Sequence, residues 1–178
     1  METVTFETAL GLFALGWTER GLARVLLPDT SQKAMIERLE RAGARPGTPT
    51  RMIMSVMDRI EDYAEGRMVE FSGVPLDLTG IPDFHRRTYE RLVQVEWGRT
   101  MTYGDLARAL GDVTLSRAVG QAMGANPMPL VIPCHRVLAS NGKVGGFSAP
   151  GGTATKARML ALEGVSIGAP AGQMSFGF

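Results

Sequence analysis

Residues 126–137 read Asn-Pro-Met-Pro-Leu-Val-Ile-Pro-Cys-His-Arg-Val and contain the only cysteine of the chain, Cys134. The apolar run between prolines predicts a short buried strand that ends in a rigid turn, where the thiol would be held at the edge of a core. His135 and Arg136 follow directly, and basic or cationic neighbours lower a thiol pKa from its usual value of about 8.5. A lone cysteine, however, is more often an inert buried residue than a nucleophile. Taken by itself, this stretch favours the inert interpretation.

The composition restricts the class of protein. With 178 residues, 44% of them hydrophobic and 21% charged, the chain can form one globular domain or two small ones. It has no apolar run of about 18 residues and does not open like a signal peptide, so we expect no membrane partner. One cysteine and two histidines exclude an internal disulfide and leave too few ligands for a structural zinc site. We expect a cytoplasmic protein, because a free thiol fits a reducing compartment.

The charge is distributed unevenly along the chain. Residues 1–75 carry a net charge of −2 and residues 76–178 a net charge of +3. A positive face on one half is what a polyanionic partner would need. The difference is small enough to arise from a few surface residues, so charge alone decides little.

The N-terminal pattern predicts strands followed by helices. Three short runs between turn signals predict strands at Val4–Phe6, Leu10–Gly16 and Leu22–Leu27. A helix is expected from a Ser31 cap to about residue 42, and apolar residues at helical spacing predict a second one over residues 53–64. Residues 74–82 contain prolines and a glycine without a helical period, which indicates a linker.

Two short helices with a tight turn between them are predicted in the C-terminal half, after a helix that we expect Asp83 to cap. Thr102–Asp105 resembles a capping box and opens the first, and the second runs from about Leu115 to Ala125. This is the layout of a helix-turn-helix. The second helix carries many small residues and a single charge, Arg117. That pattern fits either close helix packing or contact of the helix backbone with a narrow DNA minor groove.

Five segments, in this order and spacing, resemble one family. They are Thr102-Tyr103-Gly104-Asp105-Leu106-Ala107, Ser116-Arg117-Ala118-Val119-Gly120, Asn126-Pro127, Pro133-Cys134-His135-Arg136-Val137 and Leu162-Glu163-Gly164. They make roughly the C-terminal half of the chain similar to the O6-alkylguanine-DNA alkyltransferases, the methylated-DNA–protein-cysteine methyltransferases. One such motif would be a weak signal, but five correctly ordered segments are specific.

The resemblance implies an α/β fold in two parts. Residues 1–75 would form a small N-terminal α/β domain with a short antiparallel sheet plus helices, followed by a linker at 76–82. Residues 83–164 would form a mainly helical, winged-helix-like DNA-binding domain that contains the helix-turn-helix. Residues 165–178 would be a mobile tail.

The resemblance also implies direct-reversal DNA repair. The partner of a monomeric protein would be double-stranded DNA that contains O6-alkylguanine, with O4-alkylthymine as a second candidate, and the damaged nucleotide would be flipped out of the duplex. Cys134 would attack the alkyl carbon, while His135 takes the thiol proton through a water and Glu163 orients His135. The family implies no cofactor and no catalytic metal, and each molecule would react once.

Further residues take binding roles by their positions in the family motifs. Tyr103, Asn126, Phe147 and Ser148 would line or brace the substrate pocket. Arg117 would fill the space that the flipped base leaves, and the other expected DNA contacts are Ser116, Ala118, Gly120, Gln121 and Arg136. The pocket loop departs from the family pattern at Ala149-Pro150, which leaves the range of accepted alkyl groups open.

Two alternatives use the same residues differently. A Cys-His-Glu hydrolase acting on a small acyl substrate would turn over repeatedly, but it gives no role to Arg117 or to the small-residue helix. A non-catalytic module that binds DNA lesions would make the thiol incidental. Cys134 argues against this module, because the non-repairing members of the family carry tryptophan at that position.

Overall fold

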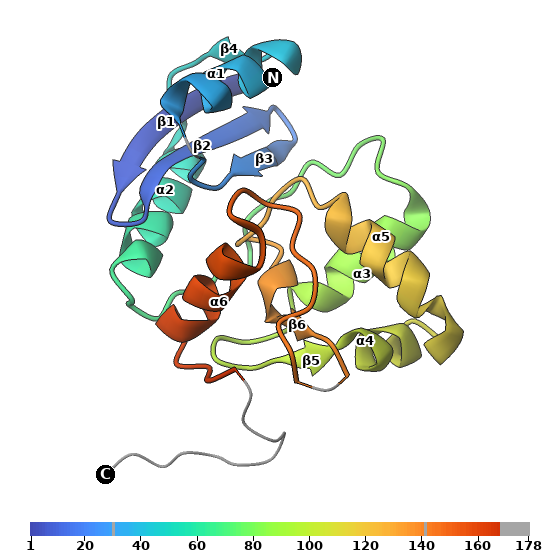
Figure 1. Cartoon of the computed structure of the whole chain (residues 1–178). Coiled ribbons are helices and arrows are strands. Elements are labelled where there is room, and N and C mark those ends of the chain that lie inside the picture. The colour runs from blue at the N-terminus through green and yellow to red at the C-terminus, as the bar shows by residue number, and fades with distance from the viewer. Residues whose placement is uncertain (30, 141, 168–178) are drawn as a thin grey trace.

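The N-terminal residues form a four-stranded sheet with the order β3-β2-β1-β4 (Figure 1). Strands β1 (Glu2–Thr8), β2 (Gly11–Thr18) and β3 (Gly21–Leu26) are antiparallel neighbours, and the short strand β4 (Arg45–Pro46) runs parallel to β1. The three predicted strands are confirmed, with ends that differ by a few residues. This computed structural model describes residues 1–29, 31–140 and 142–167, so most of the predicted tail at 165–178 lies outside the described residues.

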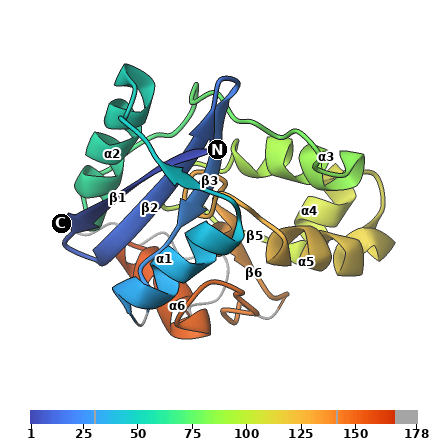
Figure 2. The same ribbon diagram turned by 90° about the horizontal axis from the view of Figure 1, so that it is seen from above.

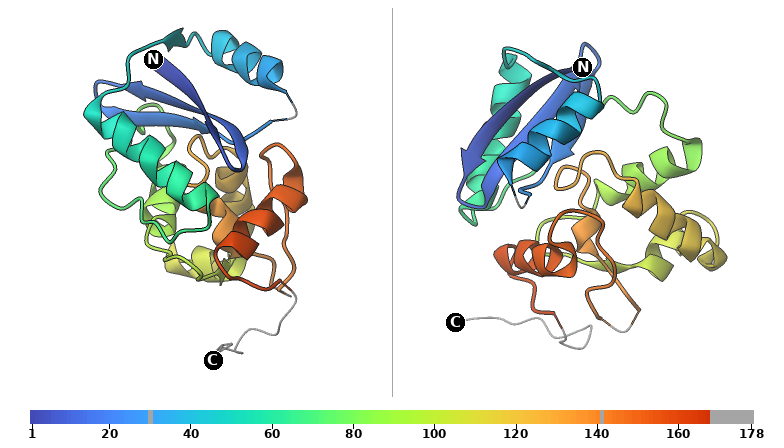
Figure 3. Two further views of the ribbon diagram at one scale, coloured as in Figure 1. Left: turned by 90° about the vertical axis from the view of Figure 1, so that its left-hand side faces the viewer. Right: turned by 45° about the horizontal axis from the view of Figure 1, so that its top comes forward.

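Two helices cover opposite faces of the sheet (Figure 3). Alternate side chains of a strand point to opposite faces, and β2 shows this plainly. Phe13 and Leu15 pack in the large core together with α2 (Arg51–Ala64), whereas Ala14 packs against α1 (Gln32–Arg41) on the other side. Both helices lie where the sequence predicts them.

Side-chain caps define where the helices begin. Ser31 caps α1 as expected, and Thr50 caps α2, each by accepting a hydrogen bond from a backbone amide of the first turn. Thr102 and Asp105 form the predicted capping box, in which each side chain accepts a hydrogen bond from the backbone amide of the other residue. Asp83, in contrast, does not cap its helix: it lies in the first turn, after Pro82 in the cap position.

The C-terminal half is mainly helical (Figure 2). Its helices are α3 (Asp83–Leu92), α4 (Tyr103–Ala109), α5 (Ser116–Gly124) and α6 (Gly152–Leu162), with 3-10 turns at Val113–Leu115 and Cys134–Arg136. The short strands β5 (Met101–Thr102) and β6 (Val137–Leu138) pair in parallel. With six helices and a small sheet in the described residues, the α/β class is confirmed. No helix in these ranges is long and apolar enough to cross a membrane.

The apolar run before Cys134 is buried but does not form the predicted strand. Leu130 has a positive φ of 77°, and the Ile132 amide donates back to the Met128 carbonyl at 2.8 Å, so the chain turns here. Asn126 closes the turn from inside, because its side chain donates to the Ile132 carbonyl (2.9 Å) and accepts from the Met128 amide (3.0 Å). The strand prediction is wrong because this local bracing replaces pairing with a neighbouring strand.

The segment predicted as a linker begins along the edge of β3. The Leu22 amide donates to the Pro75 carbonyl (2.8 Å), and the Asp77 amide donates to the Leu22 carbonyl (2.7 Å). The Asp77 carboxylate accepts hydrogen bonds from the Thr18 hydroxyl (2.6 Å) and the Thr79 amide (3.0 Å) and pairs with Arg20 (3.2 Å). The start of this segment is therefore attached to the sheet.

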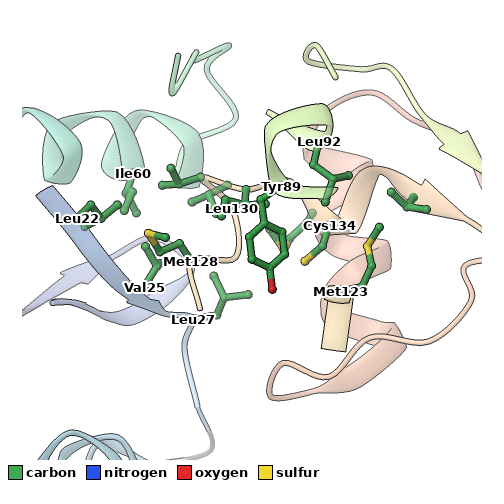
Figure 4. Close-up of a cluster of buried hydrophobic side chains, with 14 of the residues drawn as sticks. Leu22, Val25, Leu27, Ile60, Tyr89, Leu92, Met123, Met128, Leu130 and Cys134 are labelled. Carbon is green, nitrogen blue, oxygen red and sulfur yellow. The ribbon is translucent and has the colours of Figure 1, made fainter. Parts of the chain in front are cut away.

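One hydrophobic core runs through both halves of the chain (Figure 4). Leu22, Val25 and Leu27, in and after β3, and Ile60 of α2 pack in the same cluster as Tyr89 and Leu92 of α3. In this view Cys134 lies beside Tyr89 and Met123, on the helical side of the cluster. Each half therefore buries apolar surface of the other, and the position of the thiol depends on both.

The Asp77 contacts predict a pH-dependent contribution to stability. Asp77→Asn should lower the free energy of unfolding at pH 7 by about 1–3 kcal/mol, because hydrogen bonds to a charged group are lost. The Thr18 and Thr79 hydrogen bonds hold the pKa of the Asp77 carboxyl well below its usual value. The stabilisation should therefore be complete above about pH 4 and decline as the pH falls further.

Urea unfolding of both proteins at pH 7 and in acid measures this difference. Glu19→Gln is the matched control, because Glu19 lies exposed in the turn between β2 and β3. A variant as stable as the parent at pH 7 would show that the Asp77 contacts do not stabilise the fold.

Candidate active site

Cys134 is the first residue of a buried 3-10 turn, and its amide donates to the Ile132 carbonyl at 2.7 Å. The residue is only 6% exposed and is not in a disulfide. Burial raises the pKa of the Cys134 thiol, while a hydrogen bond from Asn126 and the positive charge of Lys156 act in the opposite direction. The thiol is thus protonated at rest and needs a base before it can react.

The thiol opens into a pocket of about 150 Å³. One wall comes from the C-terminal half and includes Asn126, Phe147, Ser148, Ala149 and Pro150, whereas Tyr103 does not line this pocket. The opposite wall was not predicted. It is formed by residues 24–26 of β3, by Leu27, which follows this strand, and by Arg38 of α1.

The backbone hydrogen bond from the Val25 amide to the Pro127 carbonyl (3.0 Å) joins these two walls. The N-terminal half therefore shapes the pocket that Cys134 faces, and is more than a structural partner of the helical half.

A buried carboxylate, Glu163, lies behind the thiol. Four residues give it five hydrogen bonds: His135 Nε2 (2.6 Å), Arg136 Nε (2.8 Å) and Nη2 (3.1 Å), the Gly98 amide (3.3 Å) and the Tyr63 hydroxyl (3.3 Å). Burial by itself would raise the pKa of Glu163, but the hydrogen bonds from His135 and Arg136 lower that pKa to about 2. Glu163 is therefore ionised at neutral pH.

The charge of Glu163 decides the tautomer of His135. An ionised carboxylate can only accept hydrogen bonds, so His135 Nε2 carries the proton. Burial lowers the pKa of His135, which keeps the imidazole neutral and leaves a lone pair on Nδ1. Within the described residues Nδ1 is buried without a hydrogen-bond partner. It is a free base next to Cys134 in the sequence.

The position of Arg136 contradicts its predicted DNA contact. The side chain is 5% exposed, forms two hydrogen bonds with Glu163, and donates to the Val95 carbonyl. Its guanidinium is thus not available to a phosphate. The reason is the buried carboxylate, whose charge requires a partner in the interior.

Helix α5 presents two different faces. Val119, Ala122 and Met123 are buried, whereas Arg117 and Gln121 are exposed and Ser116, Ala118 and Gly120 are half-buried. Apart from its chain neighbours and the backbone of its own helix, a Cβ atom added to Gly120 or Gly124 would meet no atom of the described residues within 4 Å. Close helix packing therefore does not explain these two glycines, which border open space.

Lys156 and Tyr63 also belong to this site, and the sequence interpretation missed both. Lys156 is fully buried under Tyr103, with Nζ 5.9 Å from the ring centre and hydrogen bonds to the carbonyls of Val137 (2.5 Å) and Gly146 (3.3 Å). Burial lowers the pKa of Lys156 to about 8. The sequence contained a signal that Lys156 is buried. Lys156, Met159, Leu160 and Glu163 share the spacing of a single helix face, so two charges lie on an apolar stripe.

No group of three or more His, Cys, Asp or Glu side chains that could hold a metal ion occurs among residues 1–29, 31–140 and 142–167.

Comparison with known proteins agrees with this fold. Residues 83–165 match the sequence model of the 6-O-methylguanine DNA methyltransferase, DNA binding domain. This places the half that carries Cys134 in a class of DNA-binding alkyl-transfer domains. The methylated-DNA–protein-cysteine methyltransferase of Mus musculus is 34% identical over 182 residues, which cover 96% of this chain and 85% of the mouse protein.

Two further relatives support the same assignment. The methylated-DNA–protein-cysteine methyltransferase of Metallosphaera sedula is 39% identical over 117 residues, covering 66% of this chain and 71% of that protein. The crystal structure of Mycobacterium tuberculosis OGT in complex with DNA has a TM-score of 0.76 and 29% identity, over 92% of this chain and 93% of that one. The chain belongs to the methylated-DNA–protein-cysteine methyltransferase family.

The buried ion pair between Arg136 and Glu163 predicts that Arg136 contributes strongly to the stability of the fold. Arg136→Ala should lower the free energy of unfolding by about 3–5 kcal/mol, because it leaves the Glu163 charge buried with one partner fewer. Arg117→Ala, which removes an exposed guanidinium, should change the same quantity by less than about 0.5 kcal/mol. Urea denaturation at pH 7 gives both values. Equal effects of the two substitutions would mean that Arg136 is not a structural partner of Glu163.

Proposed function

We propose that this protein repairs DNA by direct reversal: it binds duplex DNA, takes up a flipped O6-alkylguanine, and transfers the alkyl group to Cys134. The observation that carries the proposal is a buried thiol at a pocket, followed in the chain by a histidine whose Nδ1 has no hydrogen-bond partner among the described residues. Family membership supports the same reaction. In this proposal one monomer acts on one lesion.

The reaction follows from the positions of three residues. His135 Nδ1 accepts the thiol proton through a bridging water, and Glu163 stabilises the imidazolium that forms. The Cys134 thiolate attacks the alkyl carbon, the bond from this carbon to O6 breaks, and guanine takes up the proton. The positive charge of Lys156 stabilises the thiolate. The product is a thioether, whose carbon–sulfur bond is stable in water, so each molecule reacts once.

The leaving guanine requires hydrogen-bond donors, because charge develops on it as the bond breaks. Tyr103 and the Ser148 amide take this role in the proposal. The Tyr103 hydroxyl is 3.5 Å from the Gly146 carbonyl, a contact weak enough to be exchanged for the base. Phe147 supplies an apolar wall and Asn126 holds the turn on which Cys134 depends.

We place the DNA interface on α4 and α5, which form the helix-turn-helix of a winged-helix-like unit in this proposal. The open space around Gly120 and Gly124 supports an approach of the α5 backbone to the minor groove. Exposed Arg117 would enter the duplex in place of the flipped base, and Gln121, Ser116 and Ala118 would lie along the groove. Arg136 is left out of this interface because it is buried.

In the proposal, residues 1–75 and 83–164, joined by residues 76–82, have different functions. The last part carries the thiol and the DNA-contacting helices, and the first part supplies the second pocket wall. The hydrolase alternative is not favoured, because an acyl hydrolase has no use for an exposed α5 surface of small residues. The non-catalytic alternative is not favoured either, because it leaves the His135–Glu163 pair without a role.

Stoichiometry is the direct test of this function. Incubation with a duplex that contains O6-methylguanine should give one methyl group per chain, on the peptide with Cys134, and unmodified guanine in the DNA. Cys134→Ala should bind the same duplex but transfer nothing. Peptide mass spectrometry and nucleoside analysis measure both products. Continued turnover would indicate a hydrolase, and binding without transfer would indicate a non-catalytic module. A parallel duplex with O4-methylthymine measures whether this base is also a substrate.

Arg117→Ala should separate base flipping from chemistry. It should slow repair of O6-methylguanine in duplex DNA by about 1–3 kcal/mol of activation free energy, on the scale of unstacking costs. The same variant should react normally with free O6-benzylguanine, which needs no flipping. Single-turnover rates of the parent protein and the variant on both substrates measure this difference. A thermal melt of the variant checks that it is folded. Equal loss on both substrates would place Arg117 in the chemical step.

A further inference from the structure

Tyr63 connects the N-terminal half to the proton-accepting pair. It lies in the last turn of α2, is fully buried, and contacts both members of that pair. Its hydroxyl lies 3.3 Å from Glu163 Oε1, the same oxygen that binds His135 Nε2. Its ring meets the His135 ring edge-on, with centres 6.4 Å apart and an interplanar angle of 78°.

The hydroxyl of Tyr63 has one proton and two acceptors within reach, Glu163 Oε1 and the Met159 carbonyl at 3.2 Å. The Met159 carbonyl already accepts the Glu163 amide, so it does not depend on this hydroxyl. The ionised carboxylate is the stronger acceptor. Trp97 holds the Tyr63 ring from another side in an edge-on contact, with ring centres 5.4 Å apart. The hydroxyl is therefore fixed at the carboxylate.

We propose that Tyr63 is a positioning residue of the alkyl-transfer reaction: its hydroxyl holds Glu163 Oε1 in the orientation that binds His135 Nε2–H. This inference rests on the proposed function. It gives the N-terminal half a second role besides the pocket wall, since it sets the basicity of the group that takes the thiol proton.

The direction of the effect follows from charge. Each donor to Glu163 withdraws negative charge from the oxygen that faces His135, and so limits how strongly the carboxylate stabilises an imidazolium. Removal of the Tyr63 hydroxyl should therefore raise the pKa of His135. The other charged or titratable groups around His135 are Arg136, Lys156 and Cys134, and the substitution changes none of them.

Tyr63→Phe removes the hydroxyl and keeps the ring. We expect the rate of Cys134 alkylation by free O6-benzylguanine to fall about five- to twentyfold at pH 7, because Glu163 Oε1 is no longer held in line with His135 Nε2–H and this loss of positioning outweighs the gain in basicity. We also expect the acid limb of its pH–rate profile to move upward by about half a pH unit, because the base becomes neutral only at a higher pH. Thr88→Val is the matched control. It removes another fully buried hydroxyl, which donates to the Phe84 carbonyl one helical turn earlier, and should change neither quantity.

A double-mutant cycle with Glu163→Gln distinguishes positioning from general stability. If Tyr63 acts through Glu163, Tyr63→Phe should have little effect on the rate in the Glu163→Gln background. Additive rate losses, or a Tyr63→Phe profile that coincides with that of Thr88→Val, would overturn the proposal. The parent protein must first transfer one alkyl group per chain. If it does not, the proposed function fails, whatever Tyr63 does.

Discussion

The ionised carboxylate of Glu163 is the constraint on which the rest of the structure depends. An isolated charge in the interior would be very costly, and this one is tolerated because four residues direct five hydrogen bonds at it. The donors come from the end of α2, from the segment before β5, and from the 3-10 turn that begins at Cys134. Because these segments are far apart in the chain, the full set of five hydrogen bonds forms only when both halves are assembled. In the proposed reaction, folding therefore also orients the histidine that acts as the base for the thiol.

Two opposing demands meet at Cys134. Burial excludes water and favours the neutral thiol, whereas attack on an alkyl carbon needs the thiolate. In the proposed reaction, neutral His135 accepts the thiol proton and Glu163 stabilises the imidazolium that forms. The buried Lys156 charge stabilises the thiolate, so the thiol ionises when its proton moves to His135. Helix α5 shows a similar division. Its apolar side chains contribute to the core, and its glycines leave the opposite face open to a partner.

Much of the secondary structure could be predicted because its causes are local. Short runs between turn signals define the first three strands, and the Ser31 cap and the Thr102–Asp105 capping box define helix starts. The order of short motifs also predicted the candidate thiol, histidine and carboxylate. The run before Cys134 was predicted as a strand and is a turn, because an apolar composition cannot distinguish the two. The Asn126 side chain, which reaches the Ile132 carbonyl, decides between them.

The sequence by itself determined most of the helices and the first three strands, and its ordered motifs indicated the family and the candidate reacting residues, since each of these signals comes from residues close together in the chain. The tertiary structure alone decided where the charged side chains point. Arg136 was expected on the DNA surface and pairs with Glu163, 27 residues away, while Tyr63 reaches the same carboxylate across 100 residues. The wall formed by β3 depends in the same way on contacts between the two halves. The physical reason is that the partner of a buried charge is set by tertiary contacts between distant segments, which no local sequence pattern predicts.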